Sequence, residues 1–182
     1  MRRAVDRGCR ARARADQPDR QGSARAAQID HLADGISEVI DLGRSRAALP
    51  VWLIGTSAGT TAAVNGAAHL GSKVSGAILT ASVTRPGRAS ETIFDAEPGS
   101  IAVPVLVVSN DHDTCAETPP GDAPMVLSVL TRSPRRELVM VASSQITRRA
   151  DPCEGMSPHG YLGIEGMVVQ RISEWIRAAG GR

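Results

Sequence analysis

Aromatic side chains are scarce in this chain, at 2% of its 182 residues. The four that occur are Trp52, Phe94, Tyr161 and Trp175. Proteins that bind single-stranded nucleic acid stack its bases on aromatic rings, and cages for quaternary ammonium groups are built from the same rings. The low aromatic content therefore argues against both kinds of binding site.

Long apolar runs are also missing. No run approaches the roughly 20 residues that a membrane-spanning helix needs. The basic start of the chain, MRRAVDRGCR, is not followed by the apolar segment of a secretory signal. The sequence therefore predicts neither a membrane span nor a signal peptide.

Lysine is nearly absent, since Lys73 is the only one, and arginine is concentrated at the start of the chain. Residues 1–28 hold eight Arg and three Asp, a net charge of +5, whereas residues 29–182 have a net charge of −3. We interpret residues 1–28 as a solvated, poorly ordered arm and residues 29–182 as one folded domain. Binding of nucleic acid by the arm is an alternative, but the domain contains no recognition motif that favours it.

Strand-like and helix-like segments alternate through the domain. Apolar residues recur with helical spacing from Ile29, and Gly43 and Pro50 are expected to end this helix. Strands are predicted at 51–55, 73–83, 103–109 and 136–142, and further helices at 56–70, at 123–131 and from Ile164 to Gly180. Such alternation predicts an α/β fold, a parallel sheet flanked by helices, with ligands at the carboxyl ends of the strands.

A GxSxG motif, Gly55-Thr56-Ser57-Ala58-Gly59, stands where the first strand runs into a helix. In this context it predicts a nucleophile elbow, a strained turn that exposes the serine hydroxyl. The two glycines would prevent a collision between strand and helix, and the N–H of Ala58 would point toward a developing oxyanion. The alternative is a tight turn with a buried serine.

A serine nucleophile needs a base, and the base needs an orienting acid. Asp111 and Asp113 follow the third strand, and His159 follows the fourth. The chain order Ser57, Asp113, His159 is the one that this kind of elbow requires. The remaining histidines have no predicted role: His31, His69 and His112.

The segments VWLIGTSAGT, VPVLVVSNDHDTC and SPHGYLG resemble the C-terminal half of α/β-hydrolases, in particular bacterial serine esterases. The resemblance implies that Ser57 is the nucleophile, His159 the general base and Asp113 the orienting acid, with Asp111 as a competitor. It also implies a small carboxylic ester as substrate, which residues 84–100 and 114–122 would enclose, and no cofactor. No spacing of Cys and His resembles a zinc site, so no metal is expected.

Two of the three cysteines lie near the proposed acid and histidine. Cys115 follows Asp113 by two residues, and Cys153 precedes His159 by six. If the triad assembles, both loops meet above the sheet, which would bring the two sulfurs within bonding distance. The predicted disulfide would add roughly 3–4 kcal/mol of stability and would suggest an exported parent protein.

The sequence departs from the hydrolase pattern because it has no strands before residue 51. The backbone N–H that an early loop would supply as a second oxyanion donor has no counterpart, which leaves Ala58. The nucleophile strand also becomes a sheet edge, open to pairing with another chain. We therefore expect a truncated hydrolase or a homo-oligomer that covers the edge. A weak or inactive hydrolase-like scaffold that binds ligand or self-associates is the alternative function.

Overall fold

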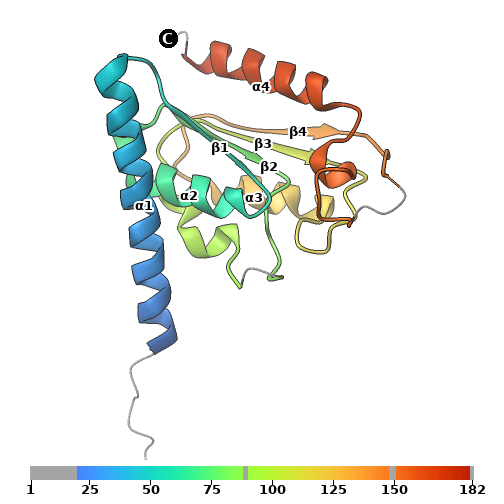
Figure 1. Cartoon of the computed structure of the whole chain (residues 1–182), viewed down its shortest axis with the longest axis horizontal. Coiled ribbons are helices and arrows are strands. Elements are labelled where there is room, and N and C mark those ends of the chain that lie inside the picture. The colour runs from blue at the N-terminus through green and yellow to red at the C-terminus, as the bar shows by residue number, and fades with distance from the viewer. Residues whose placement is uncertain (1–19, 88–89, 148–150, 181–182) are drawn as a thin grey trace, which may run out of the picture.

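The computed structural model describes residues 20–87, 90–147 and 151–180. At its centre is a four-stranded parallel sheet whose spatial order follows the chain order, β1-β2-β3-β4. The strands are β1 (Trp52–Thr56), β2 (Gly76–Thr80), β3 (Val105–Asn110) and β4 (Arg136–Val141). The predicted α/β class is confirmed (Figure 1).

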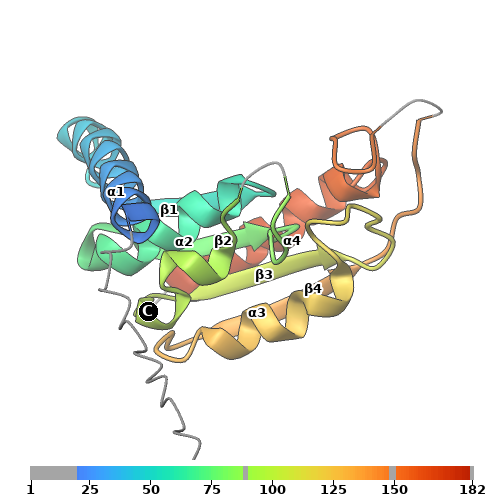
Figure 2. The ribbon, with the colours of Figure 1, turned by 90° about the horizontal axis from the view of Figure 1, so that it is seen from below.

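Helices cover both faces of this sheet (Figures 1 and 2). On one face lie α2 (Gly59–His69) and α3 (Ala123–Val129), and on the other lies α4 (Glu165–Gly180). The helix α1 (Arg20–Arg46) packs against α2, beside the β1 end of the sheet. Parallel strands need such crossover connections, and the resulting layers bury the sheet from both sides.

The two central strands supply most of the core. All five residues of β2 and all six of β3 are buried, as is typical of central parallel strands. Because side chains alternate along a strand, Leu79 and Val107 pack toward α2 and α3, whereas Ile78 and Leu106 pack toward α4. The sheet is thereby held between two apolar clusters, and its carboxyl ends are fixed in space.

The first strand is a sheet edge, as the sequence predicted. In the described part of the chain β1 pairs with β2 alone. The short apolar run at 51–55 predicts a strand that is also buried, and this second part is wrong, because only Gly55 is buried there and Ile54 is 59% exposed. The strand is partly covered, because Leu53 and Trp52 pack against the two apolar clusters, whereas Ile54 stays exposed.

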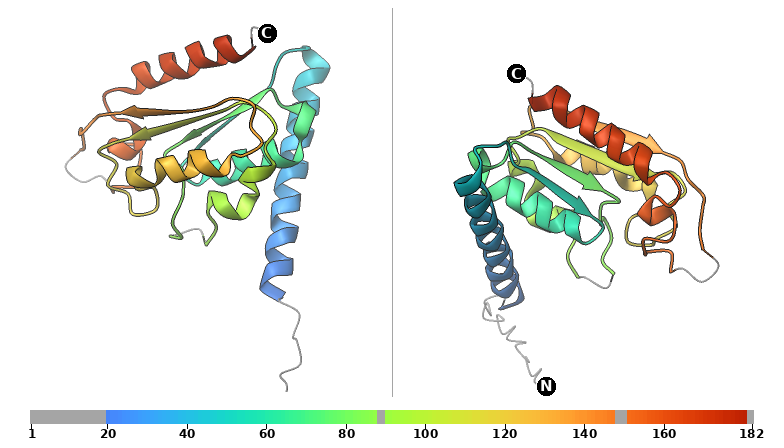
Figure 3. Two further views of the ribbon diagram at one scale, coloured as in Figure 1. Left: turned by 180° about the vertical axis from the view of Figure 1, so that it is seen from behind. Right: turned by 45° about the horizontal axis from the view of Figure 1, so that its top comes forward.

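The helix α1 is longer than predicted. It begins at Arg20, not near Ile29, and it continues through both Gly22 and Gly43 to Arg46. A glycine lowers helix stability by only about 1 kcal/mol, so it did not end the helix at either position. Its N-terminal turns extend beyond the sheet (Figure 3). The predicted arm of residues 1–28 lies mostly outside the described residues.

The segment 84–100, expected to be a loop, contains two short 3₁₀ turns, at Ile93–Ala96 and at Pro98–Ser100. Ile93 and Ala96 are fully buried in the apolar cluster that also contains α2. The segment therefore completes the core on this face of the sheet. None of the helices in the described ranges combines the length and apolar character needed to cross a membrane.

Candidate active site

The chain turns sharply from β1 into α2 at Ser57. Its φ is 53°, in the left-handed region that residues other than glycine rarely adopt. The Ser57 N–H donates to the carbonyl of Thr80 over 3.1 Å, and the Ser57 carbonyl accepts the N–H of Thr60 at 2.9 Å. The surrounding structure thus holds a strained backbone, which is the geometry expected of a nucleophile elbow.

Only one of the two motif glycines is required by this turn. A Cβ atom on Gly55 would run into the backbone of Gly59 and Thr60, whereas a Cβ on Gly59 would meet nothing within 4 Å. The prediction that both glycines prevent a collision is therefore wrong for Gly59, which is exposed at the start of α2. Close approach of strand and helix depends on Gly55.

Ala58 lies at the N-terminal end of α2. It is exposed, and its backbone is helical at φ −53° and ψ −30°. N–H groups in the first turn of a helix lack acceptors within the helix and carry the positive end of its dipole. The position that the sequence predicted for an oxyanion donor is therefore open to solvent, next to Ser57.

The structure distinguishes between the two candidate acids. Asp113 is buried, and its Oδ2 lies 2.9 Å from Nδ1 of His159. Its Oδ1 accepts the N–H of Cys115 at 2.9 Å. Asp111, in contrast, is exposed, with its N–H bonded to the carbonyl of Val141. Asp113 is the aspartate that contacts the histidine.

His159 lies in the 3₁₀ turn Pro158–Gly160 and is 3% exposed. Its backbone N–H donates to Oγ of Ser157 over 3.2 Å, and the single hydroxyl proton of Ser157 is directed to the carbonyls of Pro152 and Glu154, at 2.9 and 2.7 Å. Ser157 therefore ties the backbone of His159 to the preceding loop. With Nδ1 directed to Asp113, the ring presents Nε2 as its remaining polar atom.

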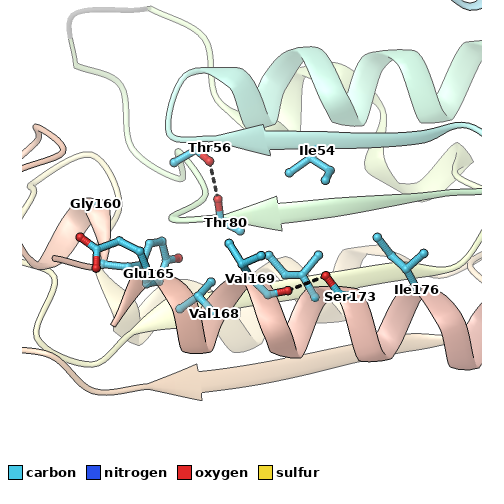
Figure 4. A pocket seen from close by; sticks show the side chains of 11 residues that line it. Ile54, Thr56, Thr80, Gly160, Glu165, Val168, Val169, Ser173 and Ile176 are labelled. Carbon is cyan, nitrogen blue, oxygen red and sulfur yellow. Dashed lines mark hydrogen bonds between the residues drawn. The ribbon is translucent and has the colours of Figure 1, made fainter. Parts of the chain in front are cut away.

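The described residues do not include a hydrogen-bond partner for Nε2 of His159, so the bond to Ser57 is not formed. The two residues nevertheless belong to one region, since their neighbours Thr56 and Gly160 line the same groove (Figure 4). Hydrogen bonds between a nucleophile and its base are often long without substrate and shorten in the complex. The structure thus joins acid and histidine and leaves the serine separate.

Three residues that the sequence did not reveal support this arrangement. The first, Thr118, contacts both Asp113 and His159.

The second, Asn110, is 1% exposed, and both the nitrogen and the oxygen of its side-chain amide form hydrogen bonds. Its Nδ2 donates to the carbonyls of Ser143 and Pro158 at 3.0 and 2.7 Å, and its Oδ1 accepts the N–H groups of His112 and Ser143. Asn110 thereby connects the end of β3 to the loop that carries the histidine.

The third is Tyr161, which has a φ of 60°. Its hydroxyl donates to the carbonyl of Val108 at 2.9 Å and accepts the N–H of Ala81 at 3.0 Å. Burial raises the pKa of the Tyr161 phenol above its ordinary value of 10.0, and the charge of Asp113 adds to the rise. The phenol therefore stays neutral and fixes the histidine loop to β2 and β3.

The predicted disulfide joins Cys115 to Cys153, with 4.7 Å between the Cα atoms. Cys115 belongs to the loop that carries Asp113, and Cys153 to the loop that carries His159. The bond therefore connects the acid loop directly to the histidine loop. Cys9, the third cysteine, lies outside the described residues.

An apolar groove of about 370 Å³ borders the site on the α4 face of the sheet. Figure 4 shows Ile54 of β1 facing Val169 and Ile176 of α4, with Thr56 and Thr80 hydrogen-bonded at the β1 side. The segments predicted to enclose substrate, 84–100 and 114–122, do not line this groove. Their Thr84 and Thr118 instead border a buried void of about 10 Å³.

Of the other histidines, only His112 enters these contacts among the described side chains and backbone groups, through its backbone N–H to Asn110. His69 ends α2 and is exposed, as is His112, while His31 is part of α1. Within the described ranges, no group of three or more His, Cys, Asp or Glu side chains is placed to hold a metal ion.

The sequence matches no protein-family model and no curated protein. Solved structures do match. Est1E from Butyrivibrio proteoclasticus has a TM-score of 0.60 at 13% identity, over 82% of this chain and 70% of its own. A structure described as LipS and LipT, two metagenome-derived lipolytic enzymes, has a TM-score of 0.60 at 14% identity, over 86% and 77%.

A third match names the fold. MGS-MChE2, an α/β-hydrolase enzyme from a lagoon-sediment metagenome, has a TM-score of 0.56 at 15% identity, over 82% of this chain and 70% of its own. At such identities the similarity establishes the fold and nothing finer. The chain therefore has an α/β-hydrolase fold, with no described strand ahead of β1, as the sequence predicted.

Proposed function

We propose that this chain is a serine hydrolase that cleaves small carboxylic esters through an acyl-enzyme on Ser57. The observation that carries the proposal is the state of the His159 ring. Its Nδ1 is held by the buried carboxylate of Asp113, and its Nε2 is buried and unpaired among the described residues. An imidazole held in this way is ready to accept a proton, and the elbow presents Ser57 at the same end of the sheet.

The acylation step follows from these positions. Oγ of Ser57 attacks the ester carbonyl carbon while Nε2 of His159 removes the hydroxyl proton. The tetrahedral intermediate carries its negative charge on the former carbonyl oxygen, toward the N–H of Ala58 at the start of α2. When the intermediate collapses, the C–O bond to the alcohol breaks, and His159 returns the proton to the leaving oxygen.

Deacylation repeats the sequence with water. His159 removes a proton from the water as its oxygen attacks the acyl carbon, and then protonates Oγ of Ser57 as the acid leaves. Each described donor to the oxyanion matters, since loss of one donor costs about 10²–10³ in rate. With Ala58 alone we expect modest turnover.

The apolar groove supports an ester with an apolar part. It borders Thr56 and Gly160, the neighbours of the proposed nucleophile and base, and its α4 wall is built largely from aliphatic side chains. The description of one structural neighbour, which names two lipolytic enzymes, agrees with this substrate class.

The test is hydrolysis of short-chain p-nitrophenyl esters, combined with labelling by a fluorophosphonate probe. The wild-type chain should hydrolyse the ester and bind the probe, whereas Ser57→Ala should do neither. Ser128→Ala, at an exposed serine of α3 whose hydroxyl bonds only to the carbonyl of Met125, should still label. Equal ester hydrolysis by wild type and Ser57→Ala would remove Ser57 from the mechanism.

A second function is favoured by the missing bond between Ser57 and His159. In this alternative the chain is a hydrolase-like scaffold that binds ligand or self-associates without turnover. The same probe separates the two functions, because only an activated serine reacts with a fluorophosphonate. Absence of labelling in a folded protein would favour the scaffold.

We also propose that a second copy covers the β1 edge. The edge is unpaired within the described sheet, and exposed apolar side chains flank it, with Ile54 at 59% and Val39 at 71%. Open apolar edges favour strand pairing between chains. Size-exclusion chromatography with light scattering should show a dimer or larger assembly that Ile54→Lys dissociates, and a folded wild-type monomer would disprove it.

A further inference from the structure

We propose that Thr118 is a positioning residue that fixes the proton of His159 on Nδ1. The inference rests on the proposed function but adds a member to the network that function requires. Oγ1 of Thr118 lies 2.8 Å from Oδ2 of Asp113 and 3.0 Å from Nδ1 of His159. Thr118 is 2% exposed, so no bulk water competes for these contacts.

The direction of each hydrogen bond follows from the carboxylate. A carboxylate oxygen only accepts hydrogen bonds, so the atoms around the carboxylate of Asp113 must donate. The hydroxyl of Thr118 therefore gives its single proton to Oδ2, and His159 also donates to Oδ2 from Nδ1. Oγ1 of Thr118 then turns a lone pair toward the same Nδ1–H.

This arrangement selects one tautomer of the histidine. A proton on Nε2 would leave a bare Nδ1 facing two oxygens, one of them a carboxylate. With the proton on Nδ1, both Asp113 and Thr118 accept from it, and the Nε2 lone pair is free to act as the base. Thr118 thus adds a second oxygen that favours the reactive form of His159.

The backbone holds Thr118 in place. Its N–H donates to the carbonyl of Cys115 at 3.2 Å, and the carbonyl of the preceding Glu117 accepts the N–H groups of Thr84 and Arg85. A β-branched side chain on such a backbone has few rotamers. The hydroxyl therefore reaches the pair without loss of side-chain freedom at the time of reaction.

The test compares Thr118→Val, which keeps the shape and removes the hydroxyl, with Thr118→Ser, which keeps the hydroxyl. The matched control is Thr92→Val, because Thr92 also donates its hydroxyl to a carboxylate, that of Asp95, but in the 3₁₀ turn at Ile93–Ala96. Two quantities are measured for each variant: the rate of fluorophosphonate labelling at Ser57 and the ¹H resonance of the His159 Nδ1–H.

Thr118→Val should slow labelling by about tenfold, the effect of losing one hydrogen bond to a charged group. Its Nδ1–H resonance should shift, because Oδ2 then accepts from one donor rather than two. Thr118→Ser should restore both values toward wild type, and Thr92→Val should change neither.

The proposal is overturned if Thr118→Val labels at the wild-type rate and keeps the wild-type Nδ1–H resonance. It is also overturned if Thr118→Ser loses as much of the labelling rate as Thr118→Val does. If Thr118→Val fails to fold, Thr118→Ala serves in its place. Should wild type not label at all, the proposed function fails, whereas the resonance still tests whether Thr118 orients His159.

Discussion

Oδ2 of Asp113 and Nδ1 of His159 lie 2.9 Å apart, although 46 positions separate the two residues in the chain. The side chains are 1% and 4% exposed, respectively. A carboxylate this deeply buried is costly unless donors surround it, and the ring N–H is one of its three donors. The pair is therefore a stable part of the fold as well as the centre of the proposed chemistry.

Replacing the buried acid Asp113 should lower activity, whereas replacing its exposed neighbour Asp111 should not. Asp113→Asn puts a neutral amide beside Nδ1 and removes the charge that favours the reactive tautomer, so kcat/KM for a p-nitrophenyl ester should fall by about 10⁴. Asp111→Asn is the control, because that side chain is exposed and should leave the rate unchanged. Equal losses in the two variants would show that Asp113 does not orient the base.

The elbow should tolerate a methyl group at one glycine and not at the other. Gly55→Ala places its Cβ against the backbone of Gly59 and Thr60, so the free energy of unfolding should fall by about 1–3 kcal/mol or more. Gly59→Ala meets open space and should not lower it. Urea denaturation measures both, and a stable Gly55→Ala variant would contradict the close approach of strand and helix.

Removing the disulfide should weaken both the fold and the site. The bond closes a loop between positions separated by 38 residues, and its loss should lower the free energy of unfolding by about 2–4 kcal/mol. Because it connects the loops of Asp113 and His159, probe labelling at Ser57 should also slow. Urea denaturation and labelling of Cys115→Ala/Cys153→Ala measure the two effects, with Cys9→Ala as the control. Unchanged labelling would show that the loops keep their places without the bond.

Alkaline pH should destabilise the protein through Tyr161. Burial raises the pKa of its phenol in the folded state, whereas the unfolded phenol keeps its ordinary value of 10.0. Below pH 10 the phenol is neutral in both states and its contribution to stability is fully present. Above pH 10 the unfolded state loses the proton first, so this contribution declines as the pH rises toward the higher folded value.

Absorbance at 295 nm measures this directly, because Tyr161 is the only tyrosine. Tyrosinate should appear together with unfolding and not before it. Tyr161→Phe should reduce the loss of stability above pH 10, although it removes two hydrogen bonds and lowers stability at neutral pH by about 1–3 kcal/mol. Ionisation at the ordinary pKa in the folded protein would contradict the buried position.

Most of the fold could be predicted from local patterns. Apolar β-rich runs identified all four strands to within a few residues, and the GxSxG motif identified the turn at Ser57. The absence of strands before residue 51 predicted the open edge of β1. The burial of β1 was mispredicted because it depends on distant elements: only β2 pairs with β1 in the described sheet. The bounds of α1 were mispredicted because a glycine lowers helix stability by only about 1 kcal/mol, so the helix continues past its glycines.

The supporting side chains of the site could not be found in this way. Thr118 and Asn110 belong to no spacing motif, since each acts on a loop that lies tens of residues further along the chain. Asp111 and Asp113 both follow β3 in the sequence, where only the family resemblance favoured Asp113; the turn after β3 buries Asp113 and leaves Asp111 exposed.

The sequence by itself determined the order of strands and helices, the strained turn at Ser57 and the pair of cysteines available for a bond. These depend on side-chain periodicity, steric limits on φ and residue type, which act over a few positions. The tertiary structure decided that Asp113, which the resemblance favoured, and not its competitor Asp111 contacts His159, and it alone showed that Thr118 lies beside Asp113 and His159. Those contacts exist because parallel strands bring the loops at their carboxyl ends to one edge of the sheet, where hydrogen bonds and a disulfide hold them together.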